Sequence, residues 1–438
     1  MIRMALAGAA IFFASTCGGG RDDSATASSA DRTAPTAGVA SAASTPRAPG
    51  AAAAPAARAP LSAKDSAFYM DMARASLAYL TNHYQSATGL VNATPDWANT
   101  TMWDVGGQLL GFLSARQLGL ISQADFDTRM QKTLGTLEHL KLFRNAAYAK
   151  LYSTRTGAIS SEGRAGWSAT DLGRFLLALK IVAVNQPQYA AQIERIAKRM
   201  DFSQIVQNGY LHGQLIGSNG KPWTFQEGRV GYEQYVATGF SEWGANVDSA
   251  LSLRANGQRI QVLGATVMSD KRYQDRLLSE PFILDGLEVG LTGDMKTLAQ
   301  GVLAAQEARY KTTGKMTAVS EDAVGQPPDY FYYFCVLCDA KPFVVETAEG
   351  HSVDTPHWIS TKAAFGWQAL MPDEYTKSLA DYLAPARDPK LGWASGVYEG
   401  THASTKTYDV NSSSVLLEIA AYQLGGGRPL MSSAGAAH

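Results

Sequence analysis

Apolar side chains recur at helical spacing along most of this chain, and no segment rich in glycine, proline and serine interrupts residues 65–425. Residues three and four positions apart share one apolar face, which is the pattern of a helix packed against a core. The clearest faces lie within 68–80, 105–113, 172–182 and 415–422. Further helices are predicted at 123–142, 188–200, 232–254, 294–311, 328–338, 358–370 and 373–384. This pattern predicts one all-α domain over residues 61–427.

The predicted helices follow one another in pairs, joined by loops of alternately short and long reach. Such pairing predicts a closed ring of helical hairpins, an (α/α)6 toroid whose inner helices line a funnel. The N-terminal loops of the inner helices would collect at its mouth, where backbone N–H groups and the positive ends of the helix dipoles are exposed. Residues 261–268 and 343–346 carry enough β-branched side chains for short strands, which we expect in the loops.

The first residues have the features of an export signal. Arg3 is followed by an apolar run over 4–13 and by small residues before Cys17. The run is shorter than the about 20 residues that a membrane-spanning helix needs. Small residues before a cysteine are typical of a bacterial lipoprotein signal over 1–17, with Cys17 carrying the lipid, although ordinary cleavage nearby is the alternative. We therefore expect an exported protein, periplasmic or anchored to the outer membrane through this lipid alone.

Residues 18–60 contain almost only alanine, serine, threonine, glycine and proline. Such a segment buries too little apolar surface to offset the entropy cost of ordering it, and we expect a disordered tether. At the other end of the chain, we expect residues 428–438 to form a flexible tail.

Several common kinds of functional site find no support in the sequence. The net charge is −1 and no basic block occurs, which argues against a nucleic-acid partner. The histidines are scattered, and Cys335 and Cys338 have no second pair, so no metal site is expected. The two cysteines form either a local disulfide or two small buried positions on one helix face. No serine-hydrolase, dinucleotide or phosphate-loop motif occurs, and no cofactor is expected.

Five times, an aromatic, glycine-rich turn that carries acidic or amide side chains leads into an apolar helix. Aromatic faces stack on pyranose rings, and carboxylates bind hydroxyls or cleave glycosidic bonds. These turns therefore predict a glycan site at the mouth of the funnel. The candidate residues, in chain order, are Trp103, Asp104, Trp167, Asp171, Glu233, Glu321, Asp322, Tyr333, Trp393 and Glu399.

Most of these acids also have a simpler structural interpretation. Thr101-x-x-Asp104 and Ser168-x-x-Asp171 match the capping box, in which the carboxylate returns a hydrogen bond to the cap. Glu233 could be a solvated glutamate in the first turn of a helix, where the dipole favours it. The adjacent loop acids could simply be solvated. The aromatic residues beside the two capping boxes favour the functional interpretation, because an aromatic side chain at a helix mouth suits a sugar ring better than a cap.

Three stretches resemble a bacterial family of uncharacterised domains that are similar to glucoamylase-type six-hairpin toroids. The stretches are 100–106 with 118–121, 167–171, and 321 onward through 360–370 to 399. The most specific is Ser360-Thr-Lys-Ala-Ala-Phe-Gly-Trp-Gln-Ala-Leu370. The resemblance covers about residues 65–425 and implies an exported, glycan-related toroid that acts on an envelope or secreted polysaccharide. It supplies no catalytic pair, and Cys335 and Cys338 are not part of its pattern.

The first hypothesis is an inverting glycoside hydrolase that acts on a glucan-like polysaccharide or oligosaccharide. Glu233 is the expected general acid, because apolar packing by neighbouring tyrosines would raise its pKa. Glu399 or Asp322, roughly 6.5–9.5 Å away, is the expected base. The remaining candidates would bind the substrate: Asp104, Asp171 and Glu321 through hydroxyls, and Trp103, Trp167, Tyr333 and Trp393 by stacking on sugar rings.

Two other functions suit the same residues. A glycan-binding lipoprotein that assists polysaccharide export would use the same aromatics and acids, but none of its carboxyls would need a shifted pKa. A polysaccharide lyase of the same architecture would need a tyrosine or histidine base and a group that neutralises a uronate. Arg164 and Arg229 are available for that second role.

Overall fold

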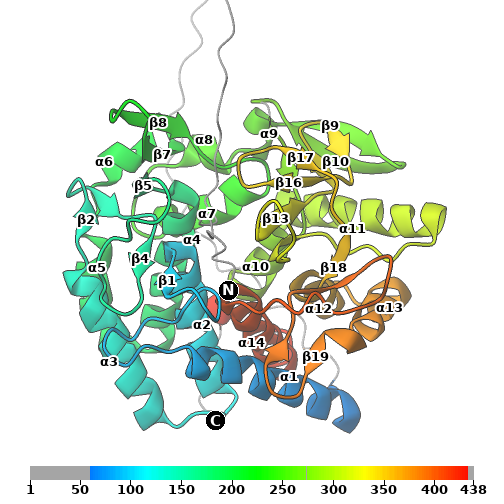
Figure 1. The fold of residues 1–438 in the computed structure, drawn as a ribbon, viewed down its shortest axis with the longest axis horizontal. Coiled ribbons are helices and arrows are strands. Elements are labelled where there is room, and N and C mark those ends of the chain that lie inside the picture. The colour runs from blue at the N-terminus through cyan, green and yellow to red at the C-terminus, as the bar shows by residue number, and fades with distance from the viewer. Residues whose placement is uncertain (1–59, 273, 433–438) are drawn as a thin grey trace, which may run out of the picture.

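The computed structural model describes residues 60–272 and 274–432, and its helices form an inner and an outer ring (Figure 1). Each inner helix packs against the next, and the last of them contacts the first, so that the inner ring is closed. The inner helices are α2 (Met102–Gln117), α4 (Ala169–Asn185), α7 (Tyr232–Ser241), α10 (Glu280–Glu288), α12 (Thr361–Leu370) and α14 (Val410–Leu424). The (α/α)6 toroid predicted from the sequence is confirmed.

The outer helices alternate with the inner ones along the chain. They are α1 (Ala63–Asn82), α3 (Gln123–His139), α5 (Ala190–Ala197), the short pair α8 (Asp248–Leu251) and α9 (Leu253–Asn256), α11 (Gly293–Thr313) and α13 (Glu374–Tyr382), with the single turn α6 (Phe202–Ile205) after α5. In the inner helix α2 every side chain from Met102 to Ala115 is buried, whereas the outer helix α3 buries one stripe that includes Phe126, Met130 and Leu134. The inner helix is therefore buried on all sides, whereas the outer helix is amphipathic.

Two glycines let the inner helices α4 and α7 approach until their backbones touch. A Cβ atom on Gly173 would lie 2.5 Å from the carbonyl oxygen of Val236, and one on Gly239 would lie 2.0 Å from the carbonyl oxygen of Gly173. No side chain fits at either position. This close packing holds the first turns of the two helices beside each other.

The first and last helices close the molecule. The outer helix α1 packs along α14, and the side-chain amide of Gln423 donates a 3.0 Å hydrogen bond to the hydroxyl of Tyr69. Beyond α14, Leu430 is buried in the turn Leu430–Ser432, and its carbonyl oxygen accepts a 2.8 Å hydrogen bond from Asn185. The packed part of the chain thus extends past the end of α14.

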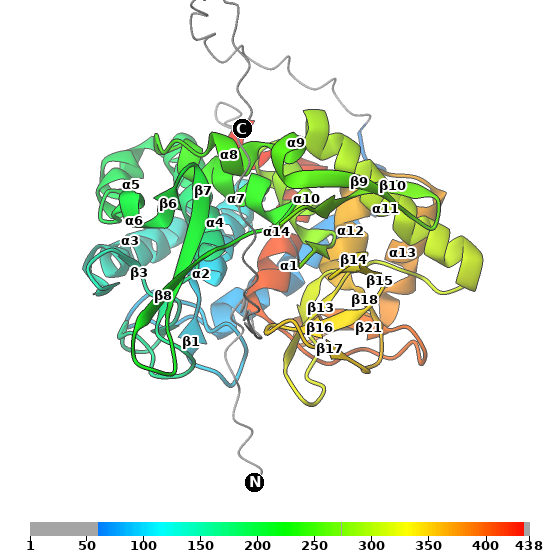
Figure 2. The same ribbon diagram turned by 90° about the horizontal axis from the view of Figure 1, so that it is seen from above.

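Short antiparallel strands are inserted in the loops, and many of them lie on one side of the helical rings (Figure 2). One four-stranded sheet joins β12 (Glu321–Ala323), β13 (Phe331–Phe334), β16 (Val345–Thr347) and β17 (Ser352–Val353), and places Glu321 opposite Tyr333. A second joins β5 (Gly166–Trp167), β6 (Val206–Gln207), β7 (Tyr210–Ile216) and β8 (Pro222–Gln226).

The other strands form smaller ladders. They are β1 (Asn99–Thr100), β2 (Leu142–Phe143), β3 (Ala147–Tyr148), β4 (Tyr152–Ser153), β9 (Gly257–Val262), β10 (Ala265–Asp270), β11 (Arg276–Leu277), β14 (Leu337–Cys338), β15 (Lys341–Pro342), β18 (Trp358–Ser360), β19 (Arg387–Asp388), β20 (Gly392–Trp393) and β21 (Gly396–Tyr398). The strands expected within 261–268 and 343–346 are present in β9, β10 and β16.

Two predicted helices are corrected. Residues 328–338 form β13 and β14 instead of a helix, because their short apolar run fits a buried strand as well as a helix and is paired with β12 and β16. In this segment Cys335 and Cys338 form a disulfide. The helix predicted over 232–254 ends at Ser241 and is followed by the separate turn α8, since Gly244 adopts φ +83° between them.

The predicted signal peptide, Cys17, nearly all of the predicted tether and residues 433–438 of the predicted tail lie outside the described residues. Of the helices in the described part, none is long and apolar enough to span a membrane.

Candidate active site at the start of the inner helices

The inner helices bring charged and aromatic side chains together where they begin. Each contributes a residue from its first turns or from the loop just before it: Trp103 and Asp104 on α2, Asp171 and Arg174 on α4, Tyr232 on α7, Glu280 on α10, Lys362 on α12 and Asn411 on α14. The following contacts join residues that are far apart in the sequence into one polar cluster, which we call the acidic pole.

A chain of polar contacts runs across the acidic pole. Arg174 donates from Nη1 to Oδ1 of Asn411 at 2.6 Å, and Asn411 donates from Nδ2 to Oε1 of Glu280 at 2.7 Å. The ammonium of Lys362 lies 2.5 Å from Oε2 of Glu280 and 3.6 Å from Oδ1 of Asp322. Four inner helices and strand β12 are therefore linked through one continuous set of side chains.

Strand β12 supplies two adjacent acids. Asp322 accepts hydrogen bonds from the indole N–H of Trp358 at 2.8 Å and the hydroxyl of Ser360 at 3.2 Å. Burial raises the pKa of Asp322 to about 7, although Lys362 opposes the shift. Burial, together with the charge of Glu280, raises the pKa of Glu321 to about 8. Both carboxyls can therefore exchange protons near neutral pH.

Asp104 completes a capping box at the start of α2, as one interpretation of the sequence predicted. Its Oδ2 accepts hydrogen bonds from the Thr101 backbone N–H at 3.2 Å and the Thr101 hydroxyl at 2.9 Å. Burial raises the pKa of Asp104 to about 6, and the bonds from Thr101 oppose that shift. Asp104 nevertheless keeps 9% of its surface exposed, and its hydrogen bonds within the described residues engage only one carboxylate oxygen. Capping thus leaves the other oxygen available to a ligand.

Asp171 stands at the same position of α4, but another residue has taken over much of the capping. Glu227 accepts hydrogen bonds from the Ser168 hydroxyl at 2.8 Å, the Thr170 hydroxyl at 3.2 Å and the Ala169 backbone N–H. Burial, followed by the charge of Glu227, raises the pKa of Asp171 to about 8. Asp171 also keeps 9% of its surface exposed. Burial and Glu227 therefore favour the protonated form of this carboxyl, while the charge of the buried Lys150 opposes them.

Aromatic rings form a floor beside these carboxyls. The Arg174 guanidinium lies 4.7 Å from the ring centre of Trp103, whose ring centre is 5.9 Å from that of Tyr232. The buried indole N–H of Trp103 has no hydrogen-bond partner in the described part of the chain. The guanidinium of Arg276 lies over Tyr333, with its Cζ atom 4.2 Å from the centre of the tyrosine ring. These rings are themselves almost fully buried, and the guanidiniums of Arg174 and Arg276 lie over the faces of Trp103 and Tyr333.

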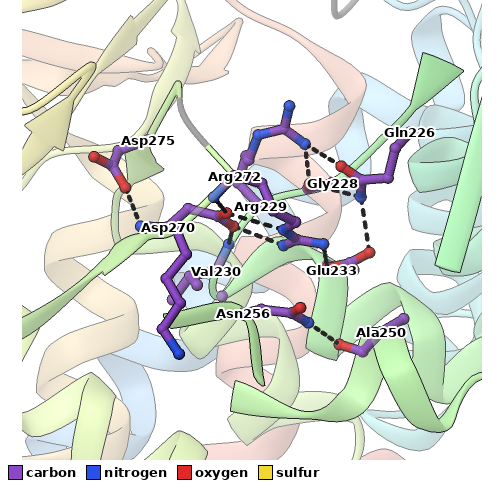
Figure 3. A network of polar contacts seen from close by, with 12 residues as sticks. Gln226, Gly228, Arg229, Val230, Glu233, Ala250, Asn256, Asp270, Arg272 and Asp275 are labelled. Carbon is purple, nitrogen blue, oxygen red and sulfur yellow. Dashed lines mark hydrogen bonds and ion pairs between the residues drawn. The ribbon is translucent and has the colours of Figure 1, made fainter. Parts of the chain in front are cut away.

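Glu233 lies in a different network, outside the acidic pole (Figure 3). Its carboxylate is 2.6 Å from Nη1 of Arg272 and accepts a 2.9 Å hydrogen bond from the side chain of Gln226. Arg272 in turn binds Asp270 at 2.6 Å. Burial raises the pKa of Glu233 to about 7, with Arg272 acting against the shift. The side chain is fully buried among these polar groups, and burial raises its pKa as the sequence predicted.

Glu399 also lies in a separate cluster. Its carboxylate is 2.7 Å from Arg309 and 3.1 Å from Lys315. Burial by itself would raise the pKa of Glu399, but the hydrogen bonds and charges of these cations together outweigh it and hold the pKa below the usual range. No contact in the described residues joins it to Glu233 or to the acidic pole. It is therefore an ionised, doubly paired carboxylate.

Two of the predicted aromatic platforms are packed inside the protein. Trp167 is fully buried, and its indole N–H donates a 3.0 Å hydrogen bond to the carbonyl oxygen of His212. Trp393 packs edge-on against Phe365, with ring centres 5.0 Å apart, beside Phe68 of α1. Of the candidates, the structure brings together Trp103, Asp104, Asp171, Glu321, Asp322 and Tyr333, and places Glu233, Glu399, Trp167 and Trp393 elsewhere.

The sequence interpretation missed Arg174, Glu227, Glu280 and Lys362. Arg174 had a visible signal, because it is a charged residue on the apolar face predicted for 172–182. Lys362 lies within the segment 360–370 that carried the resemblance. Glu227 and Glu280 had no local signal, since only the folded chain places them at the acidic pole. Within the described residues, no three His, Cys, Asp or Glu side chains are grouped so that they could hold a metal ion.

Comparison with known proteins agrees with this architecture. An endo-β-1,2-glucanase from Chitinophaga pinensis, in complex with sophorotriose and glucose, has a TM-score of 0.62 and 14% identity, covering 85% of this chain and 94% of its own. A candidate glucoamylase from Bacteroides caccae has a TM-score of 0.61 and 13% identity, covering 84% and 94%. An endo-β-1,2-glucanase from Talaromyces funiculosus, in complex with sophorose, has a TM-score of 0.58 and 13% identity, covering 84% and 86%.

At these identities the likeness establishes the six-hairpin fold, with its small sheets, and nothing finer. No curated protein matches the chain in sequence. The model of one family, described as "Protein of unknown function (DUF3131)", matches residues 71–426. Because this match spans most of the sequence, the chain belongs to the DUF3131 family.

Proposed function

We propose that the protein is an exported inverting glycoside hydrolase that cleaves a neutral glucan of the bacterial envelope or a secreted polysaccharide. The observation that carries this proposal is a pair of carboxyls on neighbouring inner helices, Asp104 with a pKa of about 6 and Asp171 with a pKa of about 8. Two carboxyls whose environments separate their pKa values are suited to opposite roles in acid–base catalysis.

The roles follow from the protonation states. At pH 7 Asp171 is mostly protonated and can give its proton to the leaving glycosidic oxygen as the general acid. Asp104 is mostly ionised and can accept a proton from the attacking water as the general base. After the reaction Asp171 is ionised and Asp104 carries the proton taken from water, and proton exchange with solvent restores the starting state. Both residues reach solvent, unlike the more deeply buried Glu280 and Asp322.

The packing of α2 on α4 supports the inverting outcome. Asp104 and Asp171 are both the third residue of their helix, so parallel neighbours place them side by side. A Cβ atom on Gly106 of α2 would lie 3.4 Å from the backbone of Phe175 on α4, which indicates a close helix pair. Close helix axes lie about 8 Å apart. Carboxyls at a comparable separation leave room for a water molecule, as an inverting mechanism requires.

Charges around the acidic pole favour a neutral sugar. Lys362 is already paired with Glu280 and Asp322, and Arg174 is fully buried against Asn411. The lyase alternative also needs a base, but burial and the nearby Glu321 raise the pKa of Tyr232 well above its ordinary value, so this phenol holds its proton. A glucan agrees with the substrates named for the similar β-1,2-glucanases and the candidate glucoamylase.

The other candidates take supporting roles in this proposal. Glu321 binds a sugar hydroxyl and Trp103 forms the floor, whereas the more deeply buried Asp322 and Tyr333 support Glu321 from the same sheet. Glu233 and Glu399, the first choices from the sequence, lie in ion-paired networks, and we assign the acid and base to Asp171 and Asp104 in their place. Export and lipid attachment at Cys17 remain part of the proposal and rest on the sequence of residues 1–17.

The test uses the full-length chain with linear β-1,2-glucan, an α-1,4-glucan and a uronate polymer. We expect new reducing ends from a glucan, no unsaturated product, and inversion of the anomeric configuration by NMR. Asp171→Asn and Asp104→Asn should each lower kcat by about 10²–10⁴-fold, the usual contribution of a general acid or base.

The matched control is Asp125→Asn on the outer helix α3. Asp125 is also the third residue of its helix and binds its cap Ser122, whose hydroxyl lies 2.7 Å away. It should keep full activity. Equal activity of wild type and Asp171→Asn would remove Asp171 from the mechanism. Glucan binding without any turnover would show the non-catalytic binding function instead.

A further inference from the structure

We propose that the β7–β8 hairpin carries a second glycan subsite, in which Trp223 and Phe225 hold a distant part of the same polymer whose cleaved bond lies at Asp104 and Asp171. This inference rests on the proposed function and extends it, because it predicts that the protein acts on long chains rather than on short oligosaccharides.

The two rings form a tilted pair, in which Trp223 is exposed and Phe225 is half-buried. The ring centres of Trp223 and Phe225 are 4.7 Å apart with an angle of 31° between the planes. Trp223 is 37% exposed, which is high for so large an apolar side chain. Phe225 packs on the buried Leu215 of β7, so the pair has a fixed base. An aromatic pair held in place by its own strand is preorganised to bind a flat apolar surface, and the face of a pyranose ring is such a surface.

The pair is continuous with the acidic pole. Alternate residues of a strand share one face, so Trp223, Phe225 and Glu227 point to the same side of the chain at and just after β8. A Cβ atom on Gly213 of β7 would lie 2.9 Å from Cζ of Phe225 and 2.5 Å from Oε2 of Glu227. Glu227 in turn binds the first turn of α4, which carries Asp171. A single row of side chains therefore leads from the exposed Trp223 to the general acid.

The hairpin also stands on the correct side of the molecule. β8 extends toward the side of the rings where β1, β13, β16 and β17 lie (Figure 2). Four residues along a strand span about 13 Å, so Trp223 lies well beyond the sugar unit that contacts Asp171. An occupant of both places must therefore be a chain of several sugars.

The size and surroundings of the pair favour a glycan over a protein partner. A stable protein interface buries about 800 Å² on each side, far more than two rings offer. The opposite face of the hairpin is polar, with Gln214 donating a 3.1 Å hydrogen bond to the hydroxyl of Thr224. A platform of this size fits the apolar face of one sugar ring.

The experiment compares a long and a short substrate with the full-length chain. Kinetics are measured on linear β-1,2-glucan and on sophorotriose for wild type, Trp223→Ala and Trp223→Phe. We expect Trp223→Ala to raise KM for the polymer by about tenfold, which corresponds to ~1.4 kcal/mol, with kcat within about twofold. Its kinetics on sophorotriose should not change, and Trp223→Phe should retain most of the polymer affinity because it keeps an aromatic face.

Leu263→Ala is the matched control, because Leu263 is another exposed apolar side chain, 49% exposed, at the tip of the β9–β10 hairpin. It should leave both substrates unaffected. An unchanged polymer KM in Trp223→Ala overturns the subsite, as does an equal loss on sophorotriose.

Affinity electrophoresis in gels that contain the polymer separates this inference from the proposed hydrolase. If wild type is retarded but cleaves nothing, and Trp223→Ala is not retarded, the subsite stands and the hydrolase proposal fails. If no glucan retards the wild type and none is cleaved, both proposals fail.

Discussion

At the scale of single residues, Glu227 controls the proton of Asp171. It accepts hydrogen bonds from the capping residues of α4, and its charge is the largest contribution after burial to the raised pKa of Asp171. The active pH range should therefore run from about 6, where Asp104 ionises, to about 8, where Asp171 loses its proton.

Glu227→Gln tests this control. The amide keeps an oxygen that can cap α4 but removes the negative charge, so the pKa of Asp171 should fall and the alkaline limb of the pH–activity profile should move to lower pH by about 1 unit. The acidic limb, set by Asp104, should stay in place.

Glu242→Gln is the control for this substitution, since Glu242 follows the opposite end of α7 and pairs with Lys180 at 3.4 Å. It should leave both limbs unchanged. An unshifted alkaline limb in Glu227→Gln, with normal folding, would show that another group sets that limb.

The sequence revealed those site residues that have a local signature. Asp104 and Asp171 stand in hydroxyl-x-x-acid motifs before apolar helices, and Trp103 lies next to one of them. The motif could not show that Glu227, more than 50 residues away, would take over the cap of α4. Nor could it separate Glu233 from Tyr232, although neighbouring residues of a helix point in directions about 100° apart and only Tyr232 faces the acidic pole.

At the scale of secondary-structure elements, the contact between α4 and α7 depends on two glycines. Gly173→Ala should destabilise the protein by about 1–3 kcal/mol, because the added methyl group overlaps the Val236 backbone and cannot be relieved by a side-chain rotation. Chemical denaturation measured by circular dichroism gives the free energy of unfolding.

A glycine-to-alanine substitution in an outer helix should instead raise the free energy of unfolding. Gly135 lies within the outer helix α3, and a Cβ atom there would meet nothing within 4 Å. Gly135→Ala should stabilise the protein by about 0.5–1 kcal/mol through helix propensity. If Gly173→Ala were as stable as Gly135→Ala, α4 and α7 could move apart without a loss of stability.

The ring of helices could be predicted because its apolar periodicity is local and long. The strands were harder, since a strand of two to four residues carries too few positions to show a period and is defined by its partner. Residues 328–338 illustrate this: Tyr333 is a strand residue because Glu321 and Glu346 pair with it on either side. That sheet supplies Glu321, Asp322 and Tyr333, so the part of the fold that was least predictable holds much of the candidate site.

At the scale of the whole molecule, buried carboxyls should make stability depend on pH. Burial raises the pKa values of Asp104, Asp171, Glu233, Asp285, Glu288, Glu321 and Asp322 to between about 6 and about 8. A carboxyl with a raised pKa in the folded state contributes stability that is complete below its unfolded pKa, about 4, and lost as the pH rises through the folded value. The Tm should therefore fall between pH 5 and pH 8.

Burial lowers the pKa values of three histidines, His83, His212 and His357, which by itself would make Tm rise with pH. These histidines are fewer than the buried carboxyls, so a falling Tm is expected. Calorimetry between pH 5 and pH 8 gives the slope of Tm against pH. The variant Asp285→Asn isolates the contribution of one carboxyl to that slope. Asp285 has a pKa of about 7, raised by burial and by Glu288, so its amide variant should gain Tm at pH 8 and little at pH 5. A Tm that rose steadily from pH 5 to pH 8 would contradict the burial of these carboxyls.

The closed ring also fixes when the protein becomes functional during its synthesis. Asn411, which joins Arg174 to Glu280, belongs to α14, the last inner helix to leave the ribosome. The same helix receives α1, made more than 300 residues earlier, and seals the ring through Gln423 and Tyr69. A nascent or prematurely terminated chain thus has neither a sealed ring nor a connected acidic pole. Closure of the inner ring and assembly of the candidate active site are therefore one event, and we expect a truncated chain to lack the proposed activity.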